Sequence, residues 1–224
     1  MSDHAHSVGP RGGRGPIEDA ISRHPRLRGL ESSSEAAFGI LDRAASGGGT
    51  IFTCGNGGSA ADAEHFVAEL MKGFEQPRPI PNKDREALST ALADRLQVGI
   101  KAVPLTGFTA LRTAIANDTD PALEFAQIVY TLAGPSDALL AISTSGNSTN
   151  IALAAEAASS RGASVVALTG ASGGRLADLA DIAVKAPATR TLEVQEFHLP
   201  IYHTLALMLE SSAVDRSSPG PGRR

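Results

Sequence analysis

The sequence predicts a three-layer α/β/α sandwich of the flavodoxin-like kind, in which helices flank both faces of a parallel sheet. Short apolar runs alternate along the chain with longer segments of helical period, as βαβ units require. Three of the apolar runs lead into loops rich in glycine and serine, which read CGNGGSAAD, STSGNSTN and LTGASGGR. The 224 residues, 42 % hydrophobic and 20 % charged, suffice for one packed domain.

Each element is predicted from its own pattern. Strands are expected where short apolar runs occur, at residues 50–54, 102–106, 137–143, 163–169 and 182–185. Helices are expected where apolar residues recur at helical spacing, at residues 34–46, 60–71, 82–97, 151–160, 175–179 and 194–213.

The last helix is apolar on most sides, so we expect it to be buried in the core or against another subunit. Pro200 lies within it and lacks the backbone donor of other residues, which predicts a kink or a later start.

The two ends of the chain differ from its centre in composition. Residues 1–16 and 214–224 are rich in Gly, Pro and Arg and nearly lack large apolar side chains. Such segments gain too little from burial to offset the entropy of ordering, so we expect both to be flexible. The domain is therefore predicted at residues 17–213, with a polar inserted segment near residues 79–99 that forms a surface helix.

Composition excludes several classes of function. A net charge of −4 and an aromatic content of 4 % argue against nucleic acid as a partner. No apolar run approaches the ~20 residues of a membrane helix, so no membrane association is expected. Cys54 is the only cysteine, and the first residues lack the apolar stretch of a signal peptide. We expect a cytoplasmic protein.

The segment STSGNS at residues 143–148 is the strongest chemical signal, because it follows an apolar strand and opens a helix. Hydroxyl groups and free backbone N–H groups at a helix N-terminus can hold a phosphate without any cation. The segment lacks the Gly-Lys-Ser/Thr ending of a P-loop, which disfavours nucleoside triphosphate hydrolysis. A plain helix cap by Asn147 or Ser148 is the alternative.

The loop GNGGSA at residues 55–60 satisfies the dinucleotide pattern G-x-G-x-x-A. That pattern also needs an acidic residue at a strand end about 20 residues later, and the sequence there is the proline-broken KGFEQPRP. Nicotinamide binding is disfavoured, and close approach of the backbone to a sugar is the better interpretation. Cys54 directly precedes this loop and is interpreted as a small buried hydrophobe.

Histidines and a carboxylate could gather beside these loops. His65 and Glu69 are four residues apart on one predicted helix and therefore share a face, although a plain surface pair would look the same. The segment VQEFHLPIYH adds Gln195, His198 and His203. Two histidines, a carboxylate and an amide can surround a divalent metal such as zinc.

Together, GNGGSAADAEHFVAEL, AIAND, AISTSGNS, LTGASGG and the QEFH-to-YH segment resemble the SIS-domain phosphoheptose isomerases over about residues 34–212. The resemblance implies a homotetramer that converts sedoheptulose 7-phosphate to D-glycero-D-manno-heptose 7-phosphate. It implies a zinc ion held by His65, Glu69, Gln195 and His203, with Glu69 and His203 also catalytic in proton transfer. The substrate contacts that it implies are Asn56, Gly57, Gly58, Glu69, Asn117, Asp118, Ser143, Thr144, Ser145, Ser148 and Gln195.

The implied reaction is a 1,2 proton shift between ketose and aldose through an enediolate. We expect burial to raise the pKa of Glu69 so that it acts as the base. A relative of the same family that binds a replication initiator lacks an acid at this position, and Glu69 therefore favours the enzyme. Two alternatives stay open: a non-catalytic sugar-phosphate sensor or protein-binding adaptor, and a lyase or deaminating isomerase acting on an amino-sugar phosphate.

Overall fold

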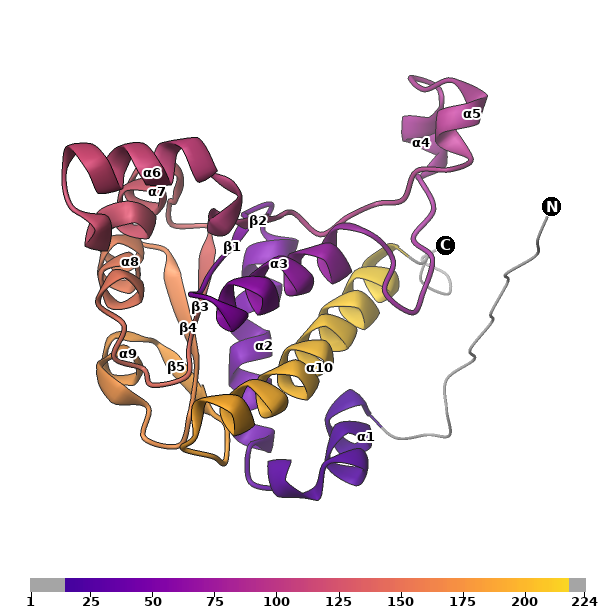
Figure 1. Ribbon diagram of the computed structural model, residues 1–224. Helices are drawn as coiled ribbons and strands as arrows, with labels where there is room; N and C mark the ends of the chain where they lie inside the picture. Colours follow the sequence, from indigo (N-terminus) through magenta and orange to yellow (C-terminus); the bar gives the residue numbers. More distant parts are fainter. Residues whose placement is uncertain (1–14, 218–224) are drawn as a thin grey trace.

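A computed structural model describes residues 15–217 of the chain. Its centre is a five-stranded parallel sheet in the order β2-β1-β3-β4-β5 (Figure 1). This is the flavodoxin-like order, so the predicted fold class is confirmed. The strands are β1 (Ile51–Cys54), β2 (Ala102–Pro104), β3 (Ala138–Ser143), β4 (Ser164–Thr169) and β5 (Ile182–Lys185).

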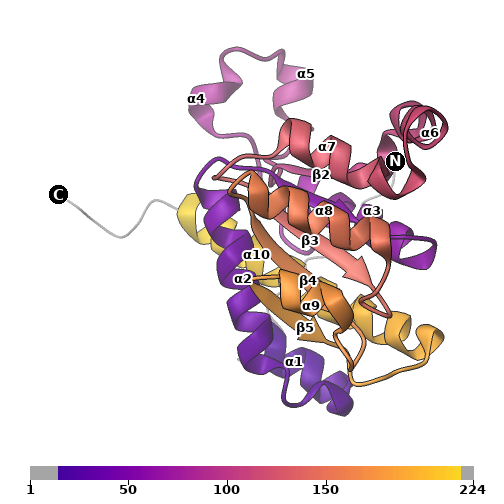
Figure 2. The same cartoon turned by 90° about the vertical axis from the view of Figure 1, so that its left-hand side faces the viewer.

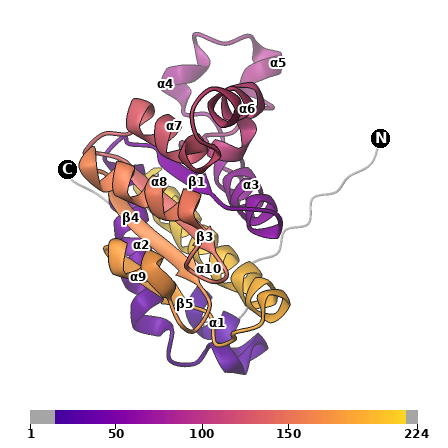
Figure 3. The same cartoon turned by 60° about the vertical axis from the view of Figure 1, so that its left-hand side comes forward.

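Helices cover both faces of the sheet, as Figures 2 and 3 show from two sides. One apolar cluster joins alternate strand residues such as Ile51 and Leu140 to α1 (Pro16–Arg23), α2 (Glu31–Ser46), α3 (Gly58–Met71) and α10 (Thr191–Ser217). The residues between them, such as Phe52 and Leu139, pack on α7 (Glu124–Leu132), α8 (Thr149–Ser160) and α9 (Gly174–Leu179). Period-two alternation with apolar residues on both sides is what a doubly covered strand requires.

The site is positioned by the strand order. From β1 the chain crosses to β2 on one side of the sheet and then to β3 on the other, so β1 and β3 flank a topological switch point. Ligands of open α/β sheets bind beyond the carboxyl ends of the strands at such a point. The loops that follow β1 and β3 are the two glycine-rich loops on which the sequence analysis depends.

The inserted segment differs from the prediction. In place of one helix over residues 82–97 it forms two single turns, α4 (Asn82–Arg85) and α5 (Thr90–Ala93), which project from the body of the molecule (Figure 1). Leu92 and Leu96 are 50 % and 46 % exposed. A helix this short needs a surface on which to bury its apolar stripe, and this stripe has none within residues 15–217.

The prediction that Pro200 delays the start of the last helix is wrong. Helix α10 begins at Thr191 and continues without interruption to Ser217, although Pro200 lies inside it. The helix packs along α3, α2 and α1, and Pro200 is itself buried. We infer that this packing outweighs the loss of one backbone hydrogen bond.

Further differences concern boundaries and missed elements. Pro16 begins a helix, and α10 continues past residue 213, so the described domain is slightly longer than predicted. Residues 1–14 and 218–224, where most of both predicted flexible ends fall, lie outside the described residues. Within residues 15–217 no helix has the length and apolar character needed to cross a membrane. The elements without a counterpart in the prediction are α1, η1 (Pro25–Leu27), η2 (Leu105–Gly107), α6 (Thr109–Asp118), η3 (Pro121–Leu123) and α7.

Candidate active site

The loops after β1 and β3 meet through a pair of side-chain amides. Asn56 Nδ2 donates to Asn150 Oδ1, and Asn150 Nδ2 donates to Asn56 Oδ1, each at 2.9 Å. Asn56 was predicted as a substrate contact, whereas Asn150 was missed although it directly follows the STSGNST stretch. The reciprocal bonds fix the two loops side by side, as the switch point requires.

The loop at residues 143–148 has the features of an anion site. Ser148 is the N-cap residue of α8, yet its side chain makes no capping hydrogen bond; instead Ser143 Oγ donates to its Oγ at 3.2 Å. Ser145 Oγ accepts from the backbone N–H of Asn147 at 3.1 Å. Ser148 and Thr144 are half-buried and Ser145 is exposed. The hydroxyl of Ser148 is thus not used for capping, which favours the phosphate interpretation over the plain cap.

Glycine is required where the third loop packs on this one. Gly146 has φ of +67°, and a Cβ there would lie 1.9 Å from the carbonyl oxygen of Gly173. The LTGASGG segment therefore packs directly against the candidate phosphate loop at Gly146.

Gln195 lies against the first glycine loop. A Cβ built on Gly58 would lie 2.2 Å from Gln195 Nε2, so only glycine leaves room for this amide. The beginning of α10 and the beginning of α3 thus meet at the GNGG loop. Gly57, with φ of +54°, is the N-cap residue of α3 and allows the turn.

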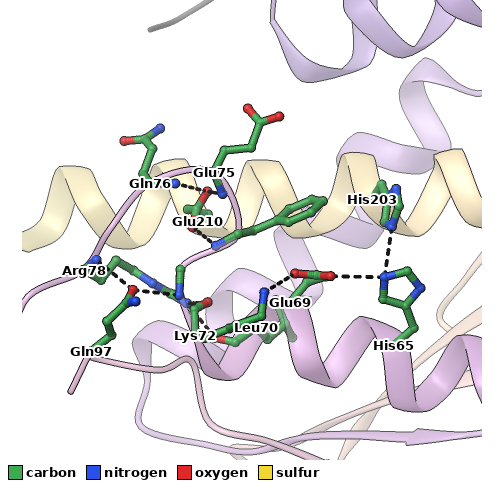
Figure 4. Close-up of polar contacts among 12 residues, drawn as sticks. His65, Glu69, Leu70, Lys72, Glu75, Gln76, Arg78, Gln97, His203 and Glu210 are labelled. Carbon is green, nitrogen blue, oxygen red and sulfur yellow. Dashed lines mark hydrogen bonds and ion pairs between the residues drawn. The ribbon is translucent and has the colours of Figure 1, made fainter. Parts of the chain in front are cut away.

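His65, Glu69 and His203 gather between α3 and α10, as Figure 4 shows. His65 Nε2 lies 3.1 Å from Glu69 Oε1 and 3.5 Å from His203 Nε2. The His65 side chain is 42 % exposed and the Glu69 side chain 12 %. The structure brings together these three of the four predicted metal ligands, from segments more than a hundred residues apart in the sequence.

The expectation that the pKa of Glu69 is raised is wrong, because the structure lowers it. Burial raises the pKa, but the ion pair with Lys72 and the hydrogen bond with His65 outweigh it, so the pKa of Glu69 lies below its usual value. Lys72 Nζ contacts Glu69 Oε2 at 2.7 Å from the end of the same helix. Glu69 is therefore a carboxylate at neutral pH. The spacing of three residues could have revealed this pair.

His203 is neutral at neutral pH. Burial is the main cause that lowers its pKa, and the neighbouring His65 lowers it further. The ring of Phe74 lies 5.2 Å from the ring of His203, centroid to centroid, and covers one side of it.

Tyr202 contacts the buried side of His65 and interacts with Asp62, and neither residue was predicted from the sequence as part of the site. The Tyr202 hydroxyl lies 3.0 Å from His65 Nδ1, and Tyr202 is 1 % exposed. Burial is the main cause that raises the pKa of Tyr202, and it likewise raises the pKa of Asp62, with which the hydroxyl interacts. Tyr202 precedes His203 directly, but sequence spacing does not show that it faces α3.

Asn117 and Asp118 bond to each other and make no hydrogen bond with the other predicted site residues. They end helix α6, which packs on η3 and α7, and Asn117 Nδ2 donates to Asp118 Oδ1 at 2.8 Å. Helix α6 is linked to Asn150 through Glu124. Arg112 of α6 donates to Glu124 Oε2 at 2.8 Å. Glu124 Oε1 in turn accepts from Asn150 Nδ2, also at 2.8 Å.

The side chains in this cluster have the donor chemistry of a zinc site. Two ligands of a tetrahedral zinc ion lie about 3.4 Å apart when each is about 2.1 Å from the metal. The two imidazole nitrogens, 3.5 Å apart, match that spacing, and the Glu69 oxygen is within reach. As the side chains stand, no group of three or more His, Cys, Asp or Glu in residues 15–217 forms a complete ion site. The Gln195 amide, the fourth predicted ligand, lies against Gly58 instead.

Cys54 takes no part in this arrangement. It is fully buried at the end of β1, and burial raises the pKa of its thiol to about 12. The thiol therefore stays protonated and is no nucleophile, as the sequence analysis expected.

Comparison with known proteins identifies the family. The SIS domain family matches residues 26–170. A phosphoheptose isomerase of Thiobacillus denitrificans is 40 % identical over 209 residues, which span 88 % of this chain and 96 % of the relative. The chain belongs to the phosphoheptose isomerase family of SIS-domain proteins.

Solved structures of the family agree with this fold. The phosphoheptose isomerase of Neisseria gonorrhoeae superposes with a TM-score of 0.70 at 33 % identity, covering 87 % of this chain and 95 % of that one. The phosphoheptose isomerase of Francisella tularensis gives a TM-score of 0.72 at 31 % identity, covering 87 % and 94 %. The resemblance inferred from the sequence motifs is thereby confirmed.

Proposed function

We propose that this protein is a ketose–aldose isomerase that converts sedoheptulose 7-phosphate to D-glycero-D-manno-heptose 7-phosphate. The observation that carries the proposal is the meeting of Glu69, His65 and His203 between α3 and α10. Membership of the phosphoheptose isomerase family supports the choice of substrate.

The residues divide the chemistry between binding and proton transfer. The hydroxyls of Ser143, Ser145 and Ser148 and the N-terminus of α8 hold the phosphate, far from the reacting carbons. Binding energy gained there orients the carbonyl end of the sugar. Asn56 bonds to Asn150 at the start of α8, and the Gln195 amide lies against Gly58, so both amides are available to bind the sugar next to these loops.

Glu69 is the base of the 1,2 shift. Its carboxylate is ionised, so it can take the proton from the carbon next to the carbonyl and return it to the neighbouring carbon of the enediolate. A low pKa makes it a weaker base than a carboxylate raised by burial would be, but keeps it in the active form. His203, neutral in the free protein, moves the proton between the two substrate oxygens.

We include one zinc ion per subunit in the proposal. His65 Nε2, His203 Nε2, Glu69 and Gln195 would hold it, because the first three gather in one cluster and Gln195 enters from the first turns of the same helix as His203. Zinc bound there would supply a Lewis acid for the substrate carbonyl.

We also propose a homotetramer. The projecting segment exposes Leu92, Leu96 and Val98 at 50 %, 46 % and 41 %, and Met71 beside its base is 57 % exposed. Apolar surface on a segment with almost no core of its own is typical of a subunit contact. A monomeric mass by light scattering at micromolar concentration would contradict this part of the proposal.

The adaptor is the second candidate, and Glu69→Gln separates the two. The amide keeps the shape of the side chain but cannot take a C–H proton, so isomerisation should fall by about 10² to 10⁴ while sugar phosphate still binds. Deuterium uptake from solvent and conversion of the ketose are followed by NMR in one tube. Glu64→Gln, an exposed glutamate of the same helix, is the matched control. A wild type that converts no seven-, six- or five-carbon ketose phosphate, with or without zinc, would support the adaptor.

A further inference from the structure

The two ring nitrogens of His65 have different surroundings. Nε2 faces Glu69 Oε1 at 3.1 Å and His203 Nε2 at 3.5 Å. Nδ1 faces the Tyr202 hydroxyl at 3.0 Å on the buried side of the helix. A neutral imidazole carries one proton, so one nitrogen donates and the other accepts. Which nitrogen holds the proton decides what His65 can bind.

A metal ligand needs the lone pair of Nε2, and the proton must then be on Nδ1. An Nδ1–H group needs an acceptor, and the oxygen of Tyr202 is in the right place. Once that oxygen accepts, the Tyr202 hydroxyl must direct its own hydrogen elsewhere. Phenol is suited to this position because its hydroxyl both accepts and donates.

Asp62 is the group that can take that hydrogen. It lies one turn before His65 on α3, and its carboxyl interacts with the Tyr202 hydroxyl. Its Oδ2 atom is buried and has no hydrogen-bond partner among the described residues. A buried carboxylate oxygen without a donor is costly, and the Tyr202 hydroxyl is the donor at hand.

We propose that Tyr202 and Asp62 are positioning residues that hold His65 in the Nδ1–H tautomer and so present its Nε2 to a zinc ion. In this arrangement His65 Nδ1–H donates to the Tyr202 oxygen, and the Tyr202 hydroxyl turns its hydrogen toward the Asp62 carboxyl. Outer-shell partners of this kind orient metal-binding histidines. The inference depends on the proposed zinc site.

Packing alone predicts something different. The Tyr202 ring makes edge contacts with His65, Phe66 and His203 at centroid distances of 5.5, 6.3 and 5.0 Å. If Tyr202 served only as a buried ring, Tyr202→Phe would keep these contacts and leave metal binding unchanged. If its hydroxyl only donated to Nδ1, His65 would carry its proton on Nε2 and could not bind zinc through that atom.

The test measures zinc affinity by competition with a chromophoric chelator, on the full chain. Tyr202→Phe should weaken zinc binding about 10- to 100-fold, the effect typical of a lost outer-shell partner. Asp62→Asn should do the same, because the amide would donate to the Tyr202 oxygen and turn its hydrogen toward Nδ1. Tyr130→Phe is the matched control, since Tyr130 is 56 % exposed on α7, and it should bind zinc like wild type.

Nitrogen-15 NMR of the zinc-loaded protein reads the tautomer directly. His65 should show its proton on Nδ1 in wild type, and less completely so in Tyr202→Phe. Equal zinc affinity for Tyr202→Phe and Tyr130→Phe would overturn the inference, and so would a wild type that binds no zinc. Failure of the isomerase proposal is separate: a chain that shows the predicted zinc losses but converts no sugar phosphate upholds the positioning role alone.

Discussion

Glu210 of the long helix α10 binds the backbone of residues 74–76, and Glu210→Gln should weaken this attachment. The Glu210 side chain is buried, with the residue 2 % exposed. Its Oε1 accepts the backbone N–H of Phe74 at 2.6 Å, and its Oε2 accepts those of Glu75 and Gln76 at 2.9 and 3.1 Å (Figure 4). Because the Phe74 ring contacts the His203 ring, the same bonds support the candidate active site.

The expected loss follows from the three bonds. A glutamine has one acceptor oxygen, so at best it keeps the two bonds of Oε2 and turns its NH₂ group toward the Phe74 N–H. One bond to a charged acceptor, about 1.5–3 kcal/mol, is then lost, and the other two weaken by about 1 kcal/mol each as they become neutral. Arg78, 5 % exposed, also loses a nearby negative charge. We expect the free energy of unfolding to fall by about 3.5–5 kcal/mol.

Urea unfolding at one fixed protein concentration measures this loss, since subunit association would make stability depend on concentration. Glu196→Gln, an exposed glutamate of α10, is the matched control and should stay within about 0.5 kcal/mol of wild type. Equal unfolding midpoints for Glu210→Gln and Glu196→Gln would refute the assigned role of the three hydrogen bonds.

Three further predictions concern the phosphate loop, a buried histidine and a close contact. Ser143→Ala combined with Ser148→Ala should raise the substrate KM strongly, since each bond to a charged oxygen is worth about 1.5–3 kcal/mol; normal steady-state KM would contradict the loop assignment. Burial lowers the pKa of His198 to about 4, so the unfolded chain takes up its proton near pH 6.5 and stability falls as the pH drops from there to about 4. That loss reaches about 3 kcal/mol and should be smaller in His198→Leu, when urea unfolding is compared across this pH range. Gly58→Ala would place a methyl group 2.2 Å from Gln195 Nε2, so the amide must move. The substrate KM should rise while the thermal unfolding midpoint changes little. An unchanged KM would exclude Gln195 from the site.

The sequence alone identified the fold class, because short apolar runs alternate along the chain with segments of helical period, as a parallel sheet covered by helices requires. It also located the two loops at the carboxyl ends of strands, because glycine and serine between a strand and a helix are typical of loops that bind ligands there. His65 and Glu69 were recognised as a pair because four residues make one helical turn. Each of these predictions depended on the spacing of residues that are close together in the sequence.

Contacts between distant segments could not be predicted in this way. The packing of α10 against α3 decides that Tyr202 contacts His65 at Nδ1 and that His203 contacts it at Nε2. The same packing keeps α10 helical through Pro200, while α4 and α5 stay short because nothing in the described chain covers them. Burial alone would have raised the pKa of Glu69, but Lys72 and His65 lower it below its usual value. Local sequence determined the elements and their loops, and tertiary packing decided which side chains share a site, because the electrostatic and hydrogen-bonding energies there depend on distances between segments that the sequence does not fix.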